Sequence, residues 1–89
     1  MLLIAGDSDV MWPSVSMAAA LAARRGYRTS DRLLVLPGTG HFVSPPATPT
    51  TVVRDADLVS GGAPEATAHG QRAAWNAALA FLRDVSGRP

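Results

Sequence analysis

Two short hydrophobic runs lie in the first half of the chain, at residues 2–6 and 33–36. Both are continuous rather than alternating, a pattern typical of strands buried on both faces of a parallel sheet. A helix is predicted between them, from Pro13 to about Arg25, because proline suits the first helical position and Gly26 suits the left-handed position after the last turn. This strand–helix–strand unit predicts two parallel strands joined by a right-handed crossover.

Two helical segments are expected to carry an apolar stripe. In the first, the stripe consists of Val15, Ala18, Ala19 and Ala22. In the second, which Pro64 opens, it consists of Trp75, Ala78, Leu79 and Leu82, and we expect Trp75 to lie in the core. The intervening residues 45–62 are rich in Pro, Thr and Gly and predict a long surface excursion.

The predicted fold class is α/β, with one domain segment over residues 1–85 and a disordered tail over residues 86–89. Two buried parallel strands cannot form a domain on their own, since each needs a hydrogen-bonded neighbour and cover on both faces. We therefore expect the chain to be the C-terminal piece of a longer protein. Assembly with other subunits is the less favoured alternative.

Charge and composition exclude several classes of partner. The chain has 8 Lys and Arg against 7 Asp and Glu, and no basic block that would follow a nucleic-acid backbone or an anionic membrane. It has no Cys, which removes disulfides, thiolate metal sites and a cysteine nucleophile from this chain. Because no signal-peptide or membrane-spanning pattern is present, we expect a soluble, cytoplasmic chain that binds neither nucleic acid nor membrane.

A carboxylate and an imidazole follow the two expected strands. Asp9 and His41 each lie just past a strand's carboxyl end, and parallel neighbours end at the same edge of a sheet. In a nucleophile–His–acid triad, the carboxylate accepts from one ring nitrogen, so that the other can take a proton from the nucleophile. Gly38 and Gly40 allow a tight turn that brings His41 inward. The order acid, then His, agrees with α/β hydrolases, where the nucleophile comes first.

Nearly the whole chain carries further motifs: LLIAGDSDVMWPS, LPGTGH, the paired Pro45 and Pro46, and GGAPEATAHGQRAAWNAALAFL. Together they resemble the C-terminal region of the acyl-CoA thioesterase and bile acid-CoA:amino acid N-acyltransferase family. The resemblance implies the C-terminal part of an α/β-hydrolase fold and matches Asp9 and His41 to the family's catalytic acid and base. It implies cleavage of an acyl-CoA thioester through a Ser or Cys acyl-enzyme. No separate cofactor is implied, because coenzyme A is part of the substrate.

The nucleophile itself is missing from this sequence. No G-x-S-x-G or G-x-C-x-G elbow occurs, and none of the serines near the loops lies on one: Ser8, Ser14, Ser16 and Ser44. We expect a missing N-terminal part of the hydrolase domain to supply it, and the chain alone to be inactive. Two alternatives stay open: a fragment of another α/β hydrolase, dienelactone-hydrolase-like or peptidase-like, and a non-catalytic, decayed or split subunit.

Several other residues have a structural as well as a functional interpretation. Asp7 is expected to support its loop rather than act as the acid. Trp12 is a candidate substrate-binding residue for the acyl or coenzyme A channel, with packing under the helix start as the alternative. His69 is expected at the surface or in a lid contact. The cations near the end of the first helix are expected to be solvated, with coenzyme A phosphates as the alternative contact: Arg24, Arg25 and Arg28.

Overall fold

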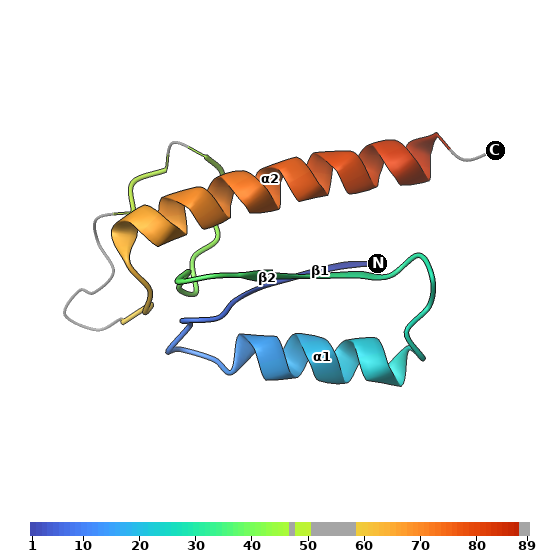
Figure 1. Cartoon of the computed structure of the whole chain (residues 1–89), viewed down its shortest axis with the longest axis horizontal. Coiled ribbons are helices and arrows are strands. Elements are labelled where there is room, and N and C mark those ends of the chain that lie inside the picture. The colour runs from blue at the N-terminus through green and yellow to red at the C-terminus, as the bar shows by residue number, and fades with distance from the viewer. Residues whose placement is uncertain (47, 51–58, 88–89) are drawn as a thin grey trace.

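The computed structural model describes residues 1–46, 48–50 and 59–87. Its elements in chain order are strand β1 (Leu2–Gly6), helix α1 (Ser14–Arg24), strand β2 (Arg32–Leu36) and helix α2 (Pro64–Ser86). The strands lie between the helices, with α1 on one side and α2 on the other (Figure 1). The predicted α/β class, with two parallel strands and two helices, is confirmed.

The two strands pair in parallel along their full length. Leu2 lies opposite Arg32, and Gly6 lies opposite Leu36. Because the strands pair without an offset, both end at the same level. The loops that follow them therefore leave from one edge of the sheet. Leu36 is almost fully buried at this end. The strand ends are therefore anchored where the candidate catalytic residues follow.

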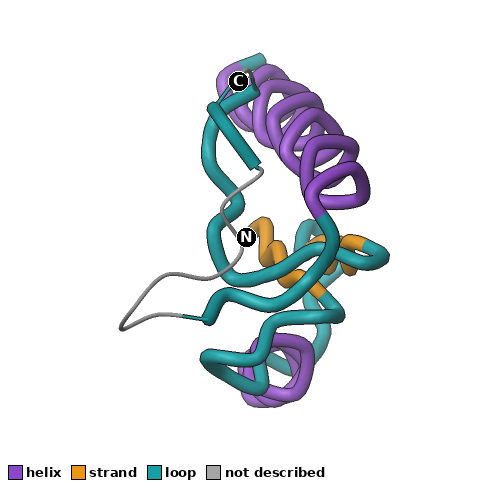
Figure 2. The backbone as a smooth tube through the Cα atoms, turned by 90° about the vertical axis from the view of Figure 1, so that its left-hand side faces the viewer, coloured by secondary structure: helices purple, strands orange, loops and turns teal. Residues whose placement is uncertain are grey.

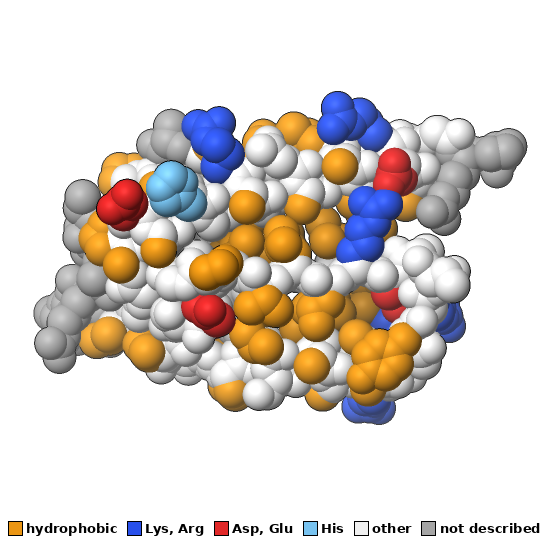
Figure 3. Space-filling view, in the orientation of Figure 1, with side chains coloured by type: hydrophobic (Ala, Val, Ile, Leu, Met, Phe, Trp, Pro, Cys, Tyr) orange, Lys and Arg blue, Asp and Glu red, His pale blue; other side chains and the backbone are white. Residues whose placement is uncertain are grey.

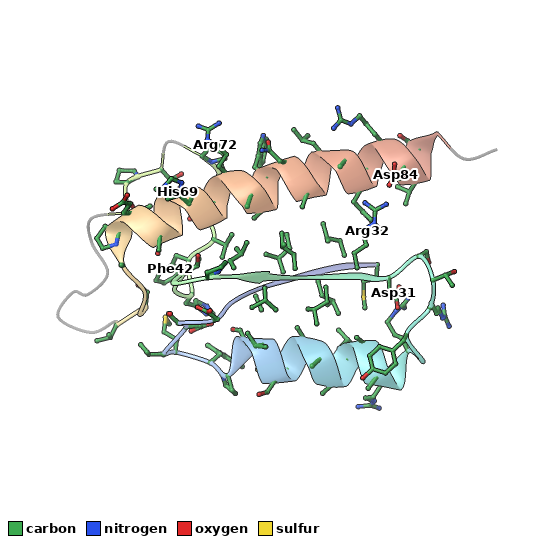
Figure 4. The ribbon with its side chains drawn as sticks, viewed as in Figure 1. Asp31, Arg32, Phe42, His69, Arg72 and Asp84 are labelled. Carbon is green, nitrogen blue, oxygen red and sulfur yellow. The ribbon has the colours of Figure 1, made fainter. Side chains whose placement is uncertain are left out.

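Ion pairs of two carboxylates, Asp31 and Asp84, fix the N-terminal end of β2, and Asp31 also pairs with the N-terminal amine of Met1 at 2.9 Å. The guanidinium of Arg25, just after α1, donates two hydrogen bonds to Asp31, at 2.8 and 3.0 Å. These bonds hold the pKa of Asp31 well below its usual range. Arg32 and Asp84 point toward one another from β2 and α2 and form another ion pair (Figure 4). Arg25 is thus a structural partner of Asp31 rather than a purely solvated cation.

The side of α2 that meets the sheet consists of small and polar residues. Its buried residues are Thr67, Gly70, Gln71 and Ala74. The approach is close, since a Cβ atom on Gly70 would lie 2.3 Å from Oγ1 of Thr39, a fully buried residue in the loop after β2. Glycine at position 70 therefore lets α2 rest directly on the loop that leads to His41.

The expectation that Trp75 lies in the core is wrong. Trp75 is 46% exposed, and Leu79 and Leu82 are 42% and 58% exposed. At the close contact near Gly70 the most buried side of the helix carries Thr67, Gly70 and Gln71, and the larger side chains beside it stay partly exposed. The strands are also less covered than predicted, because Leu33 and Val35 are 42% and 39% exposed. Figure 3 shows hydrophobic side chains at the surface along the strands, between the helices.

The end of α2 lies slightly beyond its predicted position. Ser86 is helical, and the backbone N–H of Gly87 donates to Arg83 at 2.9 Å, so the first half of the predicted tail belongs to the helix end. Residues 88–89 of that tail lie outside the described residues. Residue 47 and residues 51–58 of the predicted surface excursion also lie outside them.

The exposed apolar surface predicts self-association of the 89-residue chain on its own. Within the described residues β1 and β2 pair only with each other, and open strand edges promote pairing between chains. We expect oligomers or aggregates in size-exclusion chromatography with light scattering. The substitutions Leu79→Glu and Leu82→Glu should reduce them, whereas Ala73→Glu, at an exposed helix position, should not. A monodisperse monomer with a sharp cooperative melt would contradict this prediction.

Candidate active site

The loops that follow β1 and β2 meet at one end of the sheet. Figure 2 shows these loops between the two helices, in front of the strand ends. The backbone N–H of Ser8 donates to Thr39 at 3.0 Å, which ties the first loop to the second. The N–H groups of His41 and Val10 both donate to the carbonyl of Ser60, at 2.9 and 3.4 Å. Residues from three separate stretches of the chain therefore hold one another in place.

Glycines are required where these loops touch. A Cβ atom on Gly61, which has a φ of +78°, would lie 2.0 Å from the carbonyl oxygen of Ser8. A Cβ atom on Gly40 would lie 2.2 Å from the carbonyl oxygen of Gly61. Side chains at these positions would push the loops apart. Gly40 thus allows the backbone of His41 to approach the segment that contains Ser60.

Asp7 supports the second loop. Its Oδ1 atom accepts a hydrogen bond from the backbone N–H of Gly38 at 2.7 Å, and its own N–H donates to Leu36 at 3.0 Å. Gly38 has a left-handed φ of +61°, so the turn and the Asp7 contact fix each other. Among the described residues the imidazole of His41 bonds Asp9, not Asp7. This arrangement agrees with the supporting role predicted for Asp7.

Asp9 lies at the centre of the site, with its side chain only 2% exposed. Its Oδ1 atom accepts hydrogen bonds from the backbone N–H groups of Met11 and Trp12, at 2.9 and 3.1 Å. Its Oδ2 atom accepts from the hydroxyl of Ser14 and pairs with Nδ1 of His41 at 2.9 Å. The carboxylate thus closes its own loop and joins that loop to the imidazole.

These hydrogen bonds keep Asp9 ionised. Burial by itself raises the pKa of Asp9, because it penalises the charged form. The hydrogen bonds from Ser14 and His41, followed by those from Trp12 and Met11, outweigh burial and lower the pKa from 3.8 to about 2. At neutral pH the carboxylate can only accept hydrogen bonds.

The ionised carboxylate fixes the tautomer of His41. Because Asp9 can only accept, Nδ1 of His41 donates the hydrogen bond that joins them. In the neutral imidazole, Nε2 then carries the free lone pair. None of the described residues hydrogen-bonds Nε2, and His41 lines a cavity of about 490 Å³. The pair can therefore accept a proton at Nε2 and stabilise the resulting imidazolium through Asp9.

Two aromatic side chains flank His41. The ring of Trp12 is stacked against the imidazole, with centroids 6.5 Å apart and an interplanar angle of 18°. Phe42 meets the imidazole edge-on at 5.2 Å. Trp12 is 53% exposed and is not among the residues that line this cavity, so it lies beside His41 at the rim of the site.

A cavity of about 490 Å³ lies between β1 and α2 and opens beside His41. Asp9, Ser14 and Gln71 line it together with His41. Gln71 is only 3% exposed. The sequence motifs excluded Ser14 as the nucleophile but did not predict its bond to Asp9 or the place of Gln71 in the cavity, because an isolated Ser or Gln carries no motif.

The other predicted residues lie away from this centre. His69 is exposed on α2 and points away from the strands, 3.9 Å from Glu65 (Figure 4). Arg24 and Arg28 are exposed. Among the described residues, no cluster of His, Cys, Asp and Glu could hold a metal ion. No helix within them is long and apolar enough to cross a bilayer.

The lowered pKa of Asp9 predicts an acid-sensitive contribution to folding. Since ionisation is easier in the folded chain than in the unfolded chain, Asp9 stabilises the fold above about pH 4 and loses this effect as the pH falls through about 2. Urea unfolding between pH 5 and 2, measured in the protein that joins this chain to its nucleophile, should therefore show a smaller loss of stability in Asp9→Asn than in the unchanged protein. The pKa of Asp31 is also lowered, but Asp31 is present in both proteins, so its contribution to acid sensitivity cancels in the comparison. Equal losses of stability in the two proteins would contradict the prediction.

Comparison with known proteins agrees with the motifs of the loops and of α2. The protein family described as BAAT / Acyl-CoA thioester hydrolase C terminal matches residues 1–87. A search of curated proteins found no match. The family match spans both strands, both helices and the paired Asp9 and His41. The chain therefore belongs to the BAAT / acyl-CoA thioester hydrolase C-terminal family.

Proposed function

We propose that this chain supplies the acid and the base of a nucleophile–His–acid triad that acts on acyl-CoA thioesters. The observation that carries the proposal is the hydrogen bond of 2.9 Å between Asp9 and Nδ1 of His41 at the ends of two parallel strands. Family membership supports the substrate class, and the ionised state of Asp9 supports the direction of proton transfer. Within an α/β-hydrolase fold, these residues would occupy the second and third places of the triad in chain order.

In the proposed reaction, Nε2 of His41 takes the proton of a Ser or Cys nucleophile as it attacks the thioester carbonyl. When the tetrahedral intermediate collapses, the carbon–sulfur bond breaks and the imidazolium returns its proton to the coenzyme A thiolate. The same nitrogen then activates water or an amino acid, which takes the acyl group from the enzyme. No separate cofactor takes part, since coenzyme A belongs to the substrate.

The nucleophile is proposed to come from a segment outside these 89 residues, because the sequence has no elbow of its own. That segment would also pair with an open strand edge of the sheet. Trp12, stacked on His41 at the rim, is proposed to contact the substrate as it reaches the base. A serine nucleophile would favour hydrolysis, and a cysteine nucleophile would favour transfer to an amino acid.

The coding frame ahead of Met1 offers a direct test of the missing segment. We expect it to continue a parallel α/β sheet and to contain a nucleophile elbow, preceded by an N-terminal β-sandwich. An elbow without the sandwich would indicate a different α/β hydrolase. A stop codon or an unrelated protein directly ahead of Met1 would contradict the proposal.

Replacing the acid and the base should abolish most turnover in the protein that joins this chain to its nucleophile. His41→Ala removes the general base, with an expected loss of about 10² to 10⁴ in rate. Asp9→Asn no longer fixes the tautomer, with an expected loss on the order of 10⁴. Asp7→Asn should cost much less, because its amide oxygen can still accept from Gly38. The assay is hydrolysis of a panel of acyl-CoA thioesters.

Circular dichroism should confirm that each of these variants is folded. The isolated chain should show no turnover. Full activity in His41→Ala would remove the triad from consideration. If Asp7→Asn is inactive while Asp9→Asn is active, the acid of the triad is Asp7 and the proposal has assigned it to the wrong residue.

A further inference from the structure

We propose that Ser14 is a positioning residue for the Asp9–His41 pair, an inference that rests on the proposed function. Its hydroxyl donates to Oδ2 of Asp9, the same oxygen that accepts from Nδ1 of His41. The two backbone donors, from Met11 and Trp12, bond the other oxygen. Within the described residues, Oδ2 of Asp9 therefore has two hydrogen-bond partners, His41 and Ser14. Ser14 is the one that can hold this oxygen in place for the imidazole.

The place of Ser14 in the fold suits this task. It is the first residue of α1, and it lies four and eight residues before Ala18 and Ala22, the buried residues of that helix. Residues at this spacing share one side of a helix, so Ser14 extends the side of α1 that packs on the sheet. The hydroxyl is therefore carried by a packed helix rather than by a loop, which restricts its movement relative to Asp9.

The electrostatics of Asp9 point the same way. Burial raises the pKa of Asp9, and the Ser14 hydroxyl is the strongest of the hydrogen bonds that lower it. A hydroxyl that donates to a carboxylate favours the ionised form. Ser14 therefore helps keep Asp9 an obligate acceptor, which is the condition that places the proton of neutral His41 on Nδ1.

A nucleophilic role for Ser14 does not fit this geometry. Its hydroxyl proton is directed to the acid of the pair, not to the base, and position 14 opens a helix after Pro13 rather than occupying an elbow between glycines. Ser14 is expected to act through Asp9 alone. Its removal should change the orientation and protonation of the pair and leave substrate binding intact.

Kinetics in the protein that joins this chain to its nucleophile form the first part of the test. Ser14→Ala should lower kcat on the order of tenfold, with KM changed less than about twofold, because a hydrogen bond to a charged group is lost. Ser14→Thr keeps the hydroxyl and should restore most of kcat. Ser16→Ala, an exposed position on the same helix, is the matched control and should have no effect. In an Asp9→Asn background, Ser14→Ala should cost less than about twofold further.

The second part of the test measures which ring nitrogen of His41 carries the proton, and it does not depend on enzymatic activity. ¹⁵N NMR of His41, assigned by the signal lost in His41→Ala, should show Nδ1 protonated in the unchanged protein and a mixture of tautomers in Ser14→Ala. An unchanged tautomer in Ser14→Ala would overturn the inference, whether or not kcat falls. If the unchanged protein has no thioesterase or acyltransferase activity, the proposed function fails, and the ¹⁵N signals still decide the role of Ser14.

Discussion

The carboxylate of Asp9 is the contact on which the rest of the site depends. Four donors meet its two oxygens: two backbone N–H groups of its own loop, a hydroxyl at the start of α1, and the imidazole after β2. A buried carboxylate with fewer partners would favour its neutral form, which could donate to the imidazole and reverse the tautomer. Saturation of Asp9 with donors thus links the local loop structure to the protonation state that a base at His41 requires.

The fold around this carboxylate is arranged to bring backbones close together. Gly40 and Gly61 meet where side chains would collide, and Gly70 lets α2 rest on the buried Thr39. Each contact uses a residue with a small or absent side chain, so it contributes little apolar burial. The same contacts leave Trp75 and its apolar neighbours partly exposed, and Trp75 lines the cavity between β1 and α2. Precise placement of His41 therefore does not require a large hydrophobic core. In this chain the loops around His41 are closely packed, whereas the apolar side chains of the strands and of α2 stay partly exposed.

Sequence reasoning predicted the parts of this arrangement that follow from short-range patterns. Continuous apolar runs predicted both strands. The positions of Asp9 and His41, each just after one of two parallel strands, predicted that their side chains lie close together. The buried side of α2 could not be predicted in the same way, because hydrophobicity favoured the stripe containing Trp75, whereas the close approach at Gly70 decides which side faces the sheet. The bond from Ser14 to Asp9 and the place of Gln71 in the cavity wall depend on three-dimensional placement that no spacing rule describes.

Geometry and family membership support different parts of the proposed chemistry. An ionised carboxylate bonded to a histidine provides proton transfer, and that pairing recurs on unrelated folds and with many substrates. The family match supports the acyl-CoA thioester as the proposed substrate, whose thiolate leaving group would need less help from an acid than an amine would. With such a leaving group, the base is needed chiefly to activate the nucleophile and the acyl acceptor. In the proposed reaction the constraint on Asp9 would act on that step, because it keeps the lone pair of His41 on Nε2, beside the cavity that Gln71 also lines.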